Sequence, residues 1–413
     1  MLGRLEDVSY RLQGNSIKQK VDALLDAFEY GQEGIELVVN TLSDRTREVR
    51  QSAFLLLCDS NEDIARQAIW NYLPFAKMQC LHTLTEFNLN CYNHEQHHPE
   101  YFAIADFNNT LVCYWDLTYK SSCVNVWNLE TGQQTKNFVL SNAHEFGLGK
   151  EGRVCVVNFQ HLLWVLDIET QKHIGTYPDY LMSVVAPHPR CFTVCPRKQP
   201  LVVAGFSIGW AGEIEIWDYE TYTRRLHYQF HDLALVPHGQ SWHSSEIERL
   251  RNYASPFLFT PDGNFLVARF QQKKHSILQL WDLETAALIQ TLDNLPLLAL
   301  NALAICPDGK ILACGMREDK MCVWELTSDR ISYASSDLES SPCIMSRDGR
   351  VLICCTDNYE IIVLDLVTNK KLQTFEGHTA PVVYLAMSSD REFIASYSID
   401  KSIKIWGIPK PVT

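Results

Sequence analysis

The sequence has no excess of basic residues. Its 413 residues contain 36 Lys and Arg against 49 Asp and Glu, which gives a formal net charge of −13 at pH 7. A protein that binds a nucleic-acid backbone needs clustered Lys and Arg to displace the counterions of the phosphates. We therefore expect no nucleic acid among the main partners of this chain.

Long apolar runs are absent as well. No run approaches the roughly 20 apolar residues that span a bilayer, and the first residues, MLGRLEDVSYRL, have no apolar core of the signal-peptide kind. The sequence therefore predicts no membrane partner and a cytoplasmic location. The 14 cysteines mostly lie in apolar runs such as ILACGM and VLICC, which is typical of reduced core thiols.

One motif raises the question of an enzyme. Gly205, Ser207 and Gly209 have the G-x-S-x-G spacing of a hydrolase nucleophile. That motif requires a helix after the serine, whereas the following EIEIWD alternates apolar and polar residues as a strand does. We interpret residues 208–212 as a wide turn between two strands, and we predict that Ser207 is not catalytic.

A repeated segment accounts for these strands. A run such as IEIWD recurs seven times, mostly about 40 residues apart, and several copies continue into a turn such as LETG, YETY or LVTN. Strands and tight turns at this period are typical of a β-propeller, in which four-stranded sheets surround a central channel. The sequence therefore predicts a mostly β fold with seven blades. The copies are centred on Trp127, Leu166, Trp217, Trp281, Trp324, Leu364 and Trp406.

The last copy, FEGHTAPVVYLAMSSDREFIASYSIDKSIKIWG, resembles the WD40 repeat family. It has a Gly-His pair that ends at His378, a serine at Ser396, an aspartate at Asp400 and the tryptophan Trp406. The resemblance implies that these four side chains form a structural hydrogen-bond network inside the blade. It also implies that a WD40-type β-propeller occupies residues 76–413.

Closure of the propeller ring is expected to involve the N-terminal side of the chain. In WD40 propellers the outermost strand of the last blade comes from that side, which removes the free sheet edges. Residues 79–87, QCLHTLTEF, resemble residues 370–378 and precede the first full repeat. We therefore expect residues 79–87 to be the closing strand.

The region 1–75 has the apolar period of a helix. Ser16 begins a capping box, and Val21, Leu24, Leu25 and Phe28 lie on one face of the helix expected after it. Further short helices are expected over 33–42, 43–57 and 60–74, with Ser43 or Asp44 as the cap of the second of these and Ser60 as the cap of the third.

The stretch 44–57, with Asp44, Val49, Arg50 and Ala53, resembles a HEAT repeat, in which an Asp/Arg pair bridges turns between units. A region this short cannot bury a solenoid core alone. We therefore expect the helices to dock on the propeller, with dimerisation or partner binding as the alternatives.

The turn-rich face of the propeller is the expected binding surface. The resemblance implies that turns between second and third strands, and between blades, gather on a face that WD40 proteins often use for partners. A long insertion over residues 231–256 should also lie there. Because exposed aromatic residues anchor interfaces, we expect the partner-binding face to include Trp115, Trp210, Trp242, Tyr253, Tyr359 and Tyr397.

Two other kinds of site remain open. Cys91, His94, His97 and His98 are possible zinc ligands, but a polar loop is the favoured interpretation, so we expect no metal. The insertion carries residue types suited to acid–base catalysis or metal binding, which would make the chain an enzyme or a ligand-binding propeller. These residues are His231, Asp232, His238 and His243.

We favour a non-enzymatic scaffold without a cofactor. It would bind a protein partner on the turn-rich face, and the N-terminal helices would offer a second surface.

Overall fold

The structure is a computed structural model of residues 1–413. It describes the chain from residue 2, with longer gaps over 88–97, 177–190, 196–199, 236–256, 306–309, 336–341 and 411–413. Short gaps lie at 59, 61, 107, 119–120, 142, 150–151, 160–161, 209–210, 233, 261–262, 273–274, 296, 318–319, 327 and 329.

The chain divides into two compact units by its internal contacts. A helical unit comprises residues 1–78, 390–392 and 408–413, and a β unit comprises residues 79–389 and 393–407. No described helix is long and apolar enough to cross a membrane.

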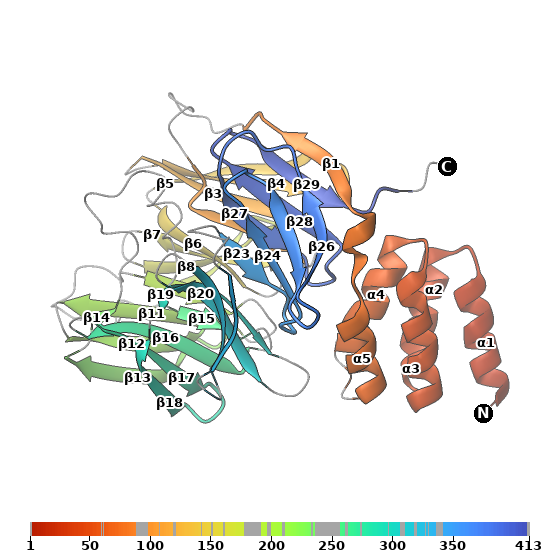
Figure 1. The fold of residues 1–413 in the computed structure, drawn as a ribbon, viewed down its shortest axis with the longest axis horizontal. Helices are drawn as coiled ribbons and strands as arrows, with labels where there is room; N and C mark the ends of the chain where they lie inside the picture. The colour runs from red at the N-terminus through yellow and green to blue at the C-terminus, as the bar shows by residue number, and fades with distance from the viewer. Residues whose placement is uncertain are drawn as a thin grey trace. The chain divides into compact units, whose positions relative to one another are not determined.

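The helical unit contains five short helices, which Figure 1 shows side by side. Helices α2 and α3 form one antiparallel pair and α4 and α5 a second, and the pairs stack because α2 lies against α4 and α3 against α5. Short 3₁₀ turns lie at Thr41–Ser43 and Pro74–Lys77. The helices are α1 (Leu2–Gln13), α2 (Ile17–Phe28), α3 (Gly31–Asn40), α4 (Arg47–Cys58) and α5 (Asp63–Asn71).

The sequence predicted the start of α2 correctly and its buried face only in part. Ser16 is the N-cap, and its hydroxyl accepts a hydrogen bond from the Gln19 backbone N–H at 3.4 Å. The buried stripe of α2 runs through Ala23, Leu24 and Ala27, whereas Leu25 is 55% exposed, so its assignment to the core face was wrong. Helix α1 was not predicted.

The β unit consists of antiparallel sheets, nearly all with four strands, and the described strands form seven of them (Figure 1). The first two are β2 (Tyr101–Ala105), β3 (Thr110–Thr118), β4 (Ser121–Asn128) with β5 (Gln134–Ser141), and β6 (Ala143–Gly149), β7 (Val154–Phe159), β8 (Leu162–Asp167) with β9 (His173–Thr176). The next two are β10 (Cys191–Val194), β11 (Leu201–Ile208), β12 (Ala211–Asp218) with β13 (Thr223–His231), and β14 (Ala234–Leu235), β15 (Phe257–Phe259), β16 (Phe265–Gln272), β17 (His275–Asp282) with β18 (Ala287–Leu295).

The chain then forms three more sheets. They are β19 (Leu297–Ile305), β20 (Ile311–Arg317), β21 (Lys320–Glu325) with β22 (Arg330–Ser335); β23 (Cys343–Met345), β24 (Val351–Cys355), β25 (Ile361–Asp365) with β26 (Lys370–Phe375); and β27 (Val382–Met387), β28 (Phe393–Ser398), β29 (Ile403–Gly407) with β1 (Gln79–Leu84).

The last sheet joins the two ends of the β unit. Strand β1 pairs antiparallel with β29, from Gln79 opposite Gly407 to Leu84 opposite Ile403. The strand expected over 79–87 therefore ends three residues early, and it is the fourth strand of the sheet that contains the last repeat.

A recurring turn explains why the third strand of many sheets ends in Asp or Asn. The side-chain oxygen accepts hydrogen bonds from groups two or three residues later, and the residue four positions later has a positive φ. The acceptor is the first residue of the turn, and the residue with positive φ is the fifth. Together they reverse the chain direction so that the fourth strand can begin. The five pairs are Asn128 with Gly132, Asp167 with Gln171, Asp218 with Tyr222, Asp282 with Ala286, and Asp365 with Asn369.

The hydrolase-like segment lies in a hairpin. Strand β11 extends to Ile208 and pairs with β12, with Ser207 opposite Gly212 and Ile208 opposite Ala211. The wide turn expected over 208–212 was therefore wrong, because Ile208, Ala211 and Gly212 lie within strands. No helix follows Ser207, since β12 begins at Ala211.

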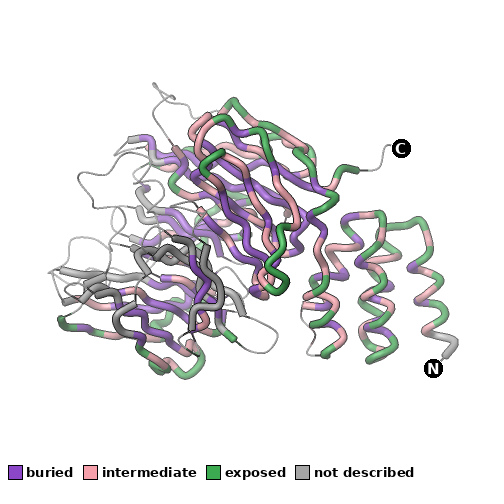
Figure 2. Tube along the Cα trace, in the orientation of Figure 1, coloured by how far each residue is buried: buried purple, intermediate pink, exposed green. Residues whose placement is uncertain are grey.

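Apolar side chains fill the space between successive sheets, and Figure 2 shows buried residues along most strands of the β unit. One core cluster joins β2–β5 to β6–β9, and another joins β2–β5 to β27–β29. The described cysteines are free thiols and most are buried, as expected for reduced core residues. The buried ones are Cys113, Cys123, Cys155, Cys195, Cys322, Cys343, Cys354 and Cys355.

Candidate functional site

The last sheet brings together the four polar residues singled out in the last repeat. His378 Nε2 lies 2.8 Å from Ser396 Oγ, and its Nδ1 lies 2.9 Å from a carboxylate oxygen of Asp400. The indole N–H of Trp406 donates to Ser396 Oγ at 3.0 Å. Ser402 adds a further contact, because its hydroxyl donates to Asp400 at 2.6 Å.

Asp400 is the electrostatic centre of this network. Burial opposes its ionisation, but hydrogen bonds from His378, Ser402 and the Thr379 backbone N–H outweigh burial and hold the pKa of Asp400 well below its usual range. The carboxylate therefore stays charged, and it orients the imidazole ring toward Ser396.

Ser396, His378 and Asp400 are the residue types of a catalytic triad, but their setting is structural. Ser396 has no exposed surface, and the His378 side chain is 1% exposed. A nucleophilic serine must reach a substrate, whereas Ser396 Oγ is buried and already accepts the Trp406 N–H. This network therefore fixes the packing of the sheet.

Two residues expected on the binding face are core residues. Trp115 is 1% exposed and Tyr397 has no exposed surface, so placing them on an exposed face was wrong. Their rings lie 5.9 Å apart, and the Phe87 ring packs 5.2 Å from Trp115. They fill the space between the β2–β5 sheet and the β27–β29 sheet, where large rings exclude water from the core.

The other residues of that expected face have different outcomes. Tyr359 is half-buried and lies in a tight turn, with φ of 68° and its backbone N–H donating to the Thr356 carbonyl. Trp210, Trp242 and Tyr253 lie outside the described residues.

His98 is the one possible zinc ligand of its loop that the structure describes. Its Nδ1 lies 2.9 Å from the Tyr397 hydroxyl, and its Nε2 lies 3.2 Å from the Lys401 ammonium. An ammonium at Nε2 takes the lone pair that a metal would use. Cys91, His94 and His97 lie outside the described residues, and the described part of the chain contains no cluster of three metal-ligating side chains.

The long insertion interrupts a strand and does not separate two sheets. Strands β14 and β15 both pair with β16, with Leu235 opposite Phe270 and Phe257 opposite Ala268. The partners of Leu235 and Phe257 are two residues apart along β16, with Arg269 between them. The insertion was expected between the third and fourth blades, and this was wrong in part, because Ala234 and Leu235 already pair within the fourth sheet.

The acid–base residues proposed for the insertion are only partly described. His231 is the last residue of β13, and Asp232 follows it with φ of 60°; both side chains are exposed. His238 and His243 lie outside the described residues.

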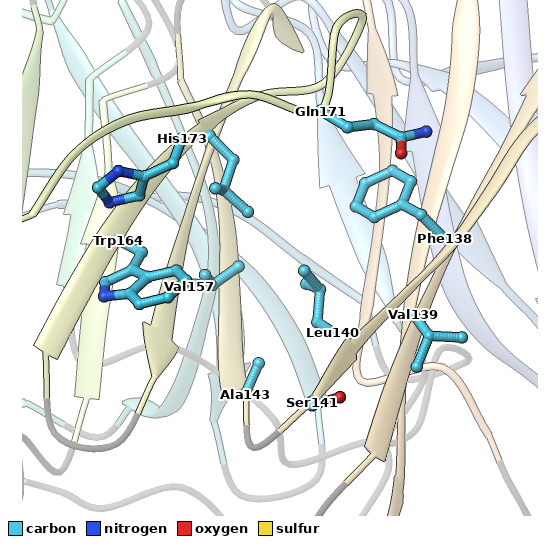
Figure 3. A pocket seen from close by; sticks show the side chains of 10 residues that line it. Phe138, Val139, Leu140, Ser141, Ala143, Val157, Trp164, Gln171 and His173 are labelled. Carbon is cyan, nitrogen blue, oxygen red and sulfur yellow. The ribbon is translucent and has the colours of Figure 1, made fainter.

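An apolar groove that the sequence did not suggest lies beside β5. Figure 3 shows it between β5, which contributes Phe138, Val139 and Leu140, and the β6–β9 sheet, which contributes Trp164 and His173. Its volume is about 300 Å³. Phe138, Leu140 and Trp164 are partly buried side chains at the edge of the core shared by the two sheets.

Polar groups border this groove. The Lys136 ammonium donates a hydrogen bond to the Glu169 backbone carbonyl, which links β5 to the turn after β8. The His173 ring packs edge-on against Trp164, with 4.9 Å between centroids. Val139 is 46% exposed in the outer strand β5, on the strand face opposite Phe138 and Leu140.

A buried ionic cluster lies in the helical unit. Arg47 pairs with Asp390 at 2.7 Å, and the Arg50 guanidinium makes two hydrogen bonds to Glu392, at 2.6 and 2.7 Å. The Tyr72 hydroxyl also donates to Glu392, and burial followed by the Glu392 charge raises the pKa of Tyr72 well above its usual range. Sequence reasoning missed both acidic partners.

The HEAT-like Asp/Arg pair has a different arrangement from the one expected. The Asp44 carboxylate pairs with Lys20 at 2.6 Å, and Arg50 donates to the backbone carbonyl of Asp44 at 2.8 Å. The two side chains are therefore not paired with each other. Val49 and Ala53 are fully buried, as their apolar face predicted.

Comparison with known families supports the interpretation of the last repeat. Residues 369–407 match the family model described as "WD domain, G-beta repeat". This segment of the chain is a WD40 repeat. The match covers β26 to β29 and includes the whole network around Asp400.

WD-repeat proteins align with part of this chain. WD repeat-containing protein 36 of Homo sapiens is 36% identical over 83 residues, which are 20% of this chain and 9% of the relative. WD repeat-containing protein SL1-17 of Schistosoma mansoni is 31% identical over 138 residues, 31% of this chain and 43% of the relative. The alignments thus span less than half of these relatives.

A solved structure extends the likeness to the fold. A chain in a crystal structure of the mitotic checkpoint complex superposes with a TM-score of 0.53 at 15% sequence identity. The alignment covers 82% of this chain and 94% of the other. The chain therefore has a mostly β, propeller-type architecture with helices at its N-terminus.

Proposed function

We propose that this WD40-repeat protein is a non-enzymatic scaffold that binds a protein partner through its β unit. WD-repeat proteins generally act as protein-interaction scaffolds. The observation that carries the proposal is the buried state of the Ser396, His378 and Asp400 set, which resembles catalytic chemistry and has no path to a substrate.

The β unit in this proposal is a closed propeller with seven blades. Contacts between strands at the start of successive sheets support a ring. Strand β2 lies against β6, β6 against β10, β10 against β15 and β15 against β19. The series continues from β19 to β23, from β23 to β27, and from β27 back to β2. Pairing of β1 with β29 would close the ring in the last blade, and a closed ring is a rigid platform.

The N-terminal helices are a HEAT-like region in this proposal. The stacking of α2 on α4 and of α3 on α5 supports it, because HEAT repeats stack helix pairs in this manner. Docking of these helices on the propeller stays a prediction, and we propose a cytoplasmic location for the whole chain.

The proposed partner surface is the turn-rich face, with Trp210, Trp242, Tyr253 and Tyr359 as its aromatic residues. Trp115 and Tyr397 are no longer part of it. Tyr359 supports the surface, because it is half-buried in the turn between β24 and β25, next to the exposed residues Asp357 and Asn358.

Affinity capture from native cytosol, read by mass spectrometry, tests the proposal. The intact chain is compared with a Trp210→Ala, Trp242→Ala variant and with Tyr10→Ala, which removes a ring that is 78% exposed in α1. We expect a reproducible partner that the double variant loses and Tyr10→Ala keeps. Loss with Tyr10→Ala alone would move the binding surface to the helices.

An enzyme or ligand-binding propeller with a site near 231–256 is the competing function. Binding of a metal or small molecule stabilises the native state and raises the melting temperature. A shift with zinc or a metabolite panel that disappears in His238→Ala or His243→Ala would favour this function over the scaffold.

A further inference from the structure

Strand β5 has an open edge. It is the last strand of its sheet, and among the described strands it pairs only with β4. Edge strands present unpaired backbone N–H and C=O groups, and proteins usually protect them with charges, Pro or bulges. Strand β5 has one charged residue, Lys136, and its residues 137–141 contain neither a charged residue nor a proline. The strand can therefore accept another extended segment.

The groove beside this edge suits one large apolar side chain. Its volume of about 300 Å³ is at the lower end of the range for small-molecule sites, which is about 300–1,000 Å³. Phe138, Leu140 and Trp164 form apolar walls, and Ala143 and Val157 close the inner side (Figure 3). In strand addition, backbone hydrogen bonds give affinity and such pockets give side-chain specificity.

The rim of the groove is more basic than the chain as a whole. Lys136 lies in β5, and Lys172 lies between Gln171 and His173, which line the groove. Two carboxylates lie in the same turn: Asp167, which accepts hydrogen bonds from Thr170 and lies 3.9 Å from Arg153, and the exposed Glu169. The three cations exceed the two carboxylates by one charge, which favours acidic residues next to the inserted side chain, even though the chain carries a net charge of −13.

We propose that the groove between β5 and the β8–β9 strands binds an extended acidic segment of a partner protein. The segment pairs with the open edge of β5, inserts one large apolar side chain between Phe138 and Trp164, and places acidic residues beside Lys136 and Lys172. This inference rests on the proposed scaffold function and names a site and a peptide chemistry for it.

The test uses fluorescence polarisation with synthetic peptides and the full chain. The probe is acetyl-Glu-Glu-Val-Trp-Val-Glu-Glu-amide, labelled with a fluorophore. Its controls replace Trp with Ala, replace every Glu with Lys, or methylate alternate backbone nitrogens to prevent strand pairing. We expect each control to bind at least about tenfold more weakly than the probe.

Matched protein variants locate the binding. Val139→Glu adds a negative charge to β5 beside its open edge, on the strand face opposite Phe138, and should weaken probe binding about tenfold, whereas Val139→Lys should preserve it. Val367→Glu is the control, because Val367 is 56% exposed in a turn of another sheet. Equal binding to Val139→Glu and Val139→Lys, or no binding of the probe to the intact chain, would overturn the proposal.

Capture from cytosol separates this inference from the scaffold function. A partner that the intact chain and Val139→Glu capture equally would refute the groove and leave the scaffold standing. If the intact chain captures nothing, the scaffold fails, while the peptide experiment still decides on the groove. Loss of the partner with Val139→Glu, but not with Val367→Glu, is the expected result.

Discussion

Replacing Asp400 with alanine should destabilise the last sheet strongly. The carboxylate accepts hydrogen bonds from His378, from the Thr379 N–H, and from both the N–H and the hydroxyl of Ser402. A hydrogen bond contributes about 1 kcal/mol, and one to a charged group contributes more. Loss of the four bonds should therefore lower the free energy of unfolding by about 4 kcal/mol.

Urea denaturation followed by circular dichroism measures this loss, and hydrogen exchange of the Thr379 and Ser402 amides locates it. Asp282→Ala is the control, because Asp282 accepts hydrogen bonds from Glu284 and Thr285 at the end of a strand and lacks a histidine partner, so the substitution should cost less. A change below 1 kcal/mol for Asp400→Ala, or unchanged exchange at the two amides, would refute the reasoning.

The same residue predicts an acid sensitivity. The pKa of Asp400 is lower in the folded protein than in the unfolded chain, so its contribution to stability is present above about pH 4 and is lost as the pH falls further. Asp400→Asn should remove this part of the pH dependence. An unchanged slope of stability against pH below 4 would contradict the assignment.

Two further substitutions test the turns and the core. Gly132→Ala should lower the free energy of unfolding by about 1–3 kcal/mol, because the new Cβ would lie 2.6 Å from His82 Cγ. Its control is Ala286→Gly at the equivalent turn position, which should change the free energy of unfolding by less than about 1 kcal/mol. Arg269→Met should raise it by about 1–3 kcal/mol, since burial lowers the pKa of Arg269 to about 10 and its Nε has no hydrogen-bond partner among the described residues. Urea titrations measure both, and a loss of stability in Arg269→Met would contradict the second.

The repeats could be predicted because one local chemistry recurs. A β-strand that ends in Asp or Asn with a threonine three residues later forms a turn whose hydrogen bonds lie within five residues, as at Asp167 and Thr170. Such contacts are encoded next to one another in the sequence. The network around His378 could be predicted for a related reason, since all its residues lie within one repeat.

Contacts between segments that are distant in the sequence could not be predicted in this way. Arg50 and Glu392 are 342 residues apart, and nothing in either segment indicates their pairing. Tryptophan is a residue type that often anchors interfaces, so Trp115 was expected to be exposed. It is buried because it packs against Phe87 and Tyr397, which come from other parts of the chain. The groove beside β5 depends equally on a neighbouring sheet.

Hydrogen exchange of the intact chain, alone and in complex with its captured partner, tests the scaffold account most directly. The account predicts slower exchange in the β unit on binding, either in the turn that contains Tyr359 or along β5. Slower exchange confined to α1–α5 would contradict it, because the partner would then bind the helical unit and the β unit would not be the interaction surface.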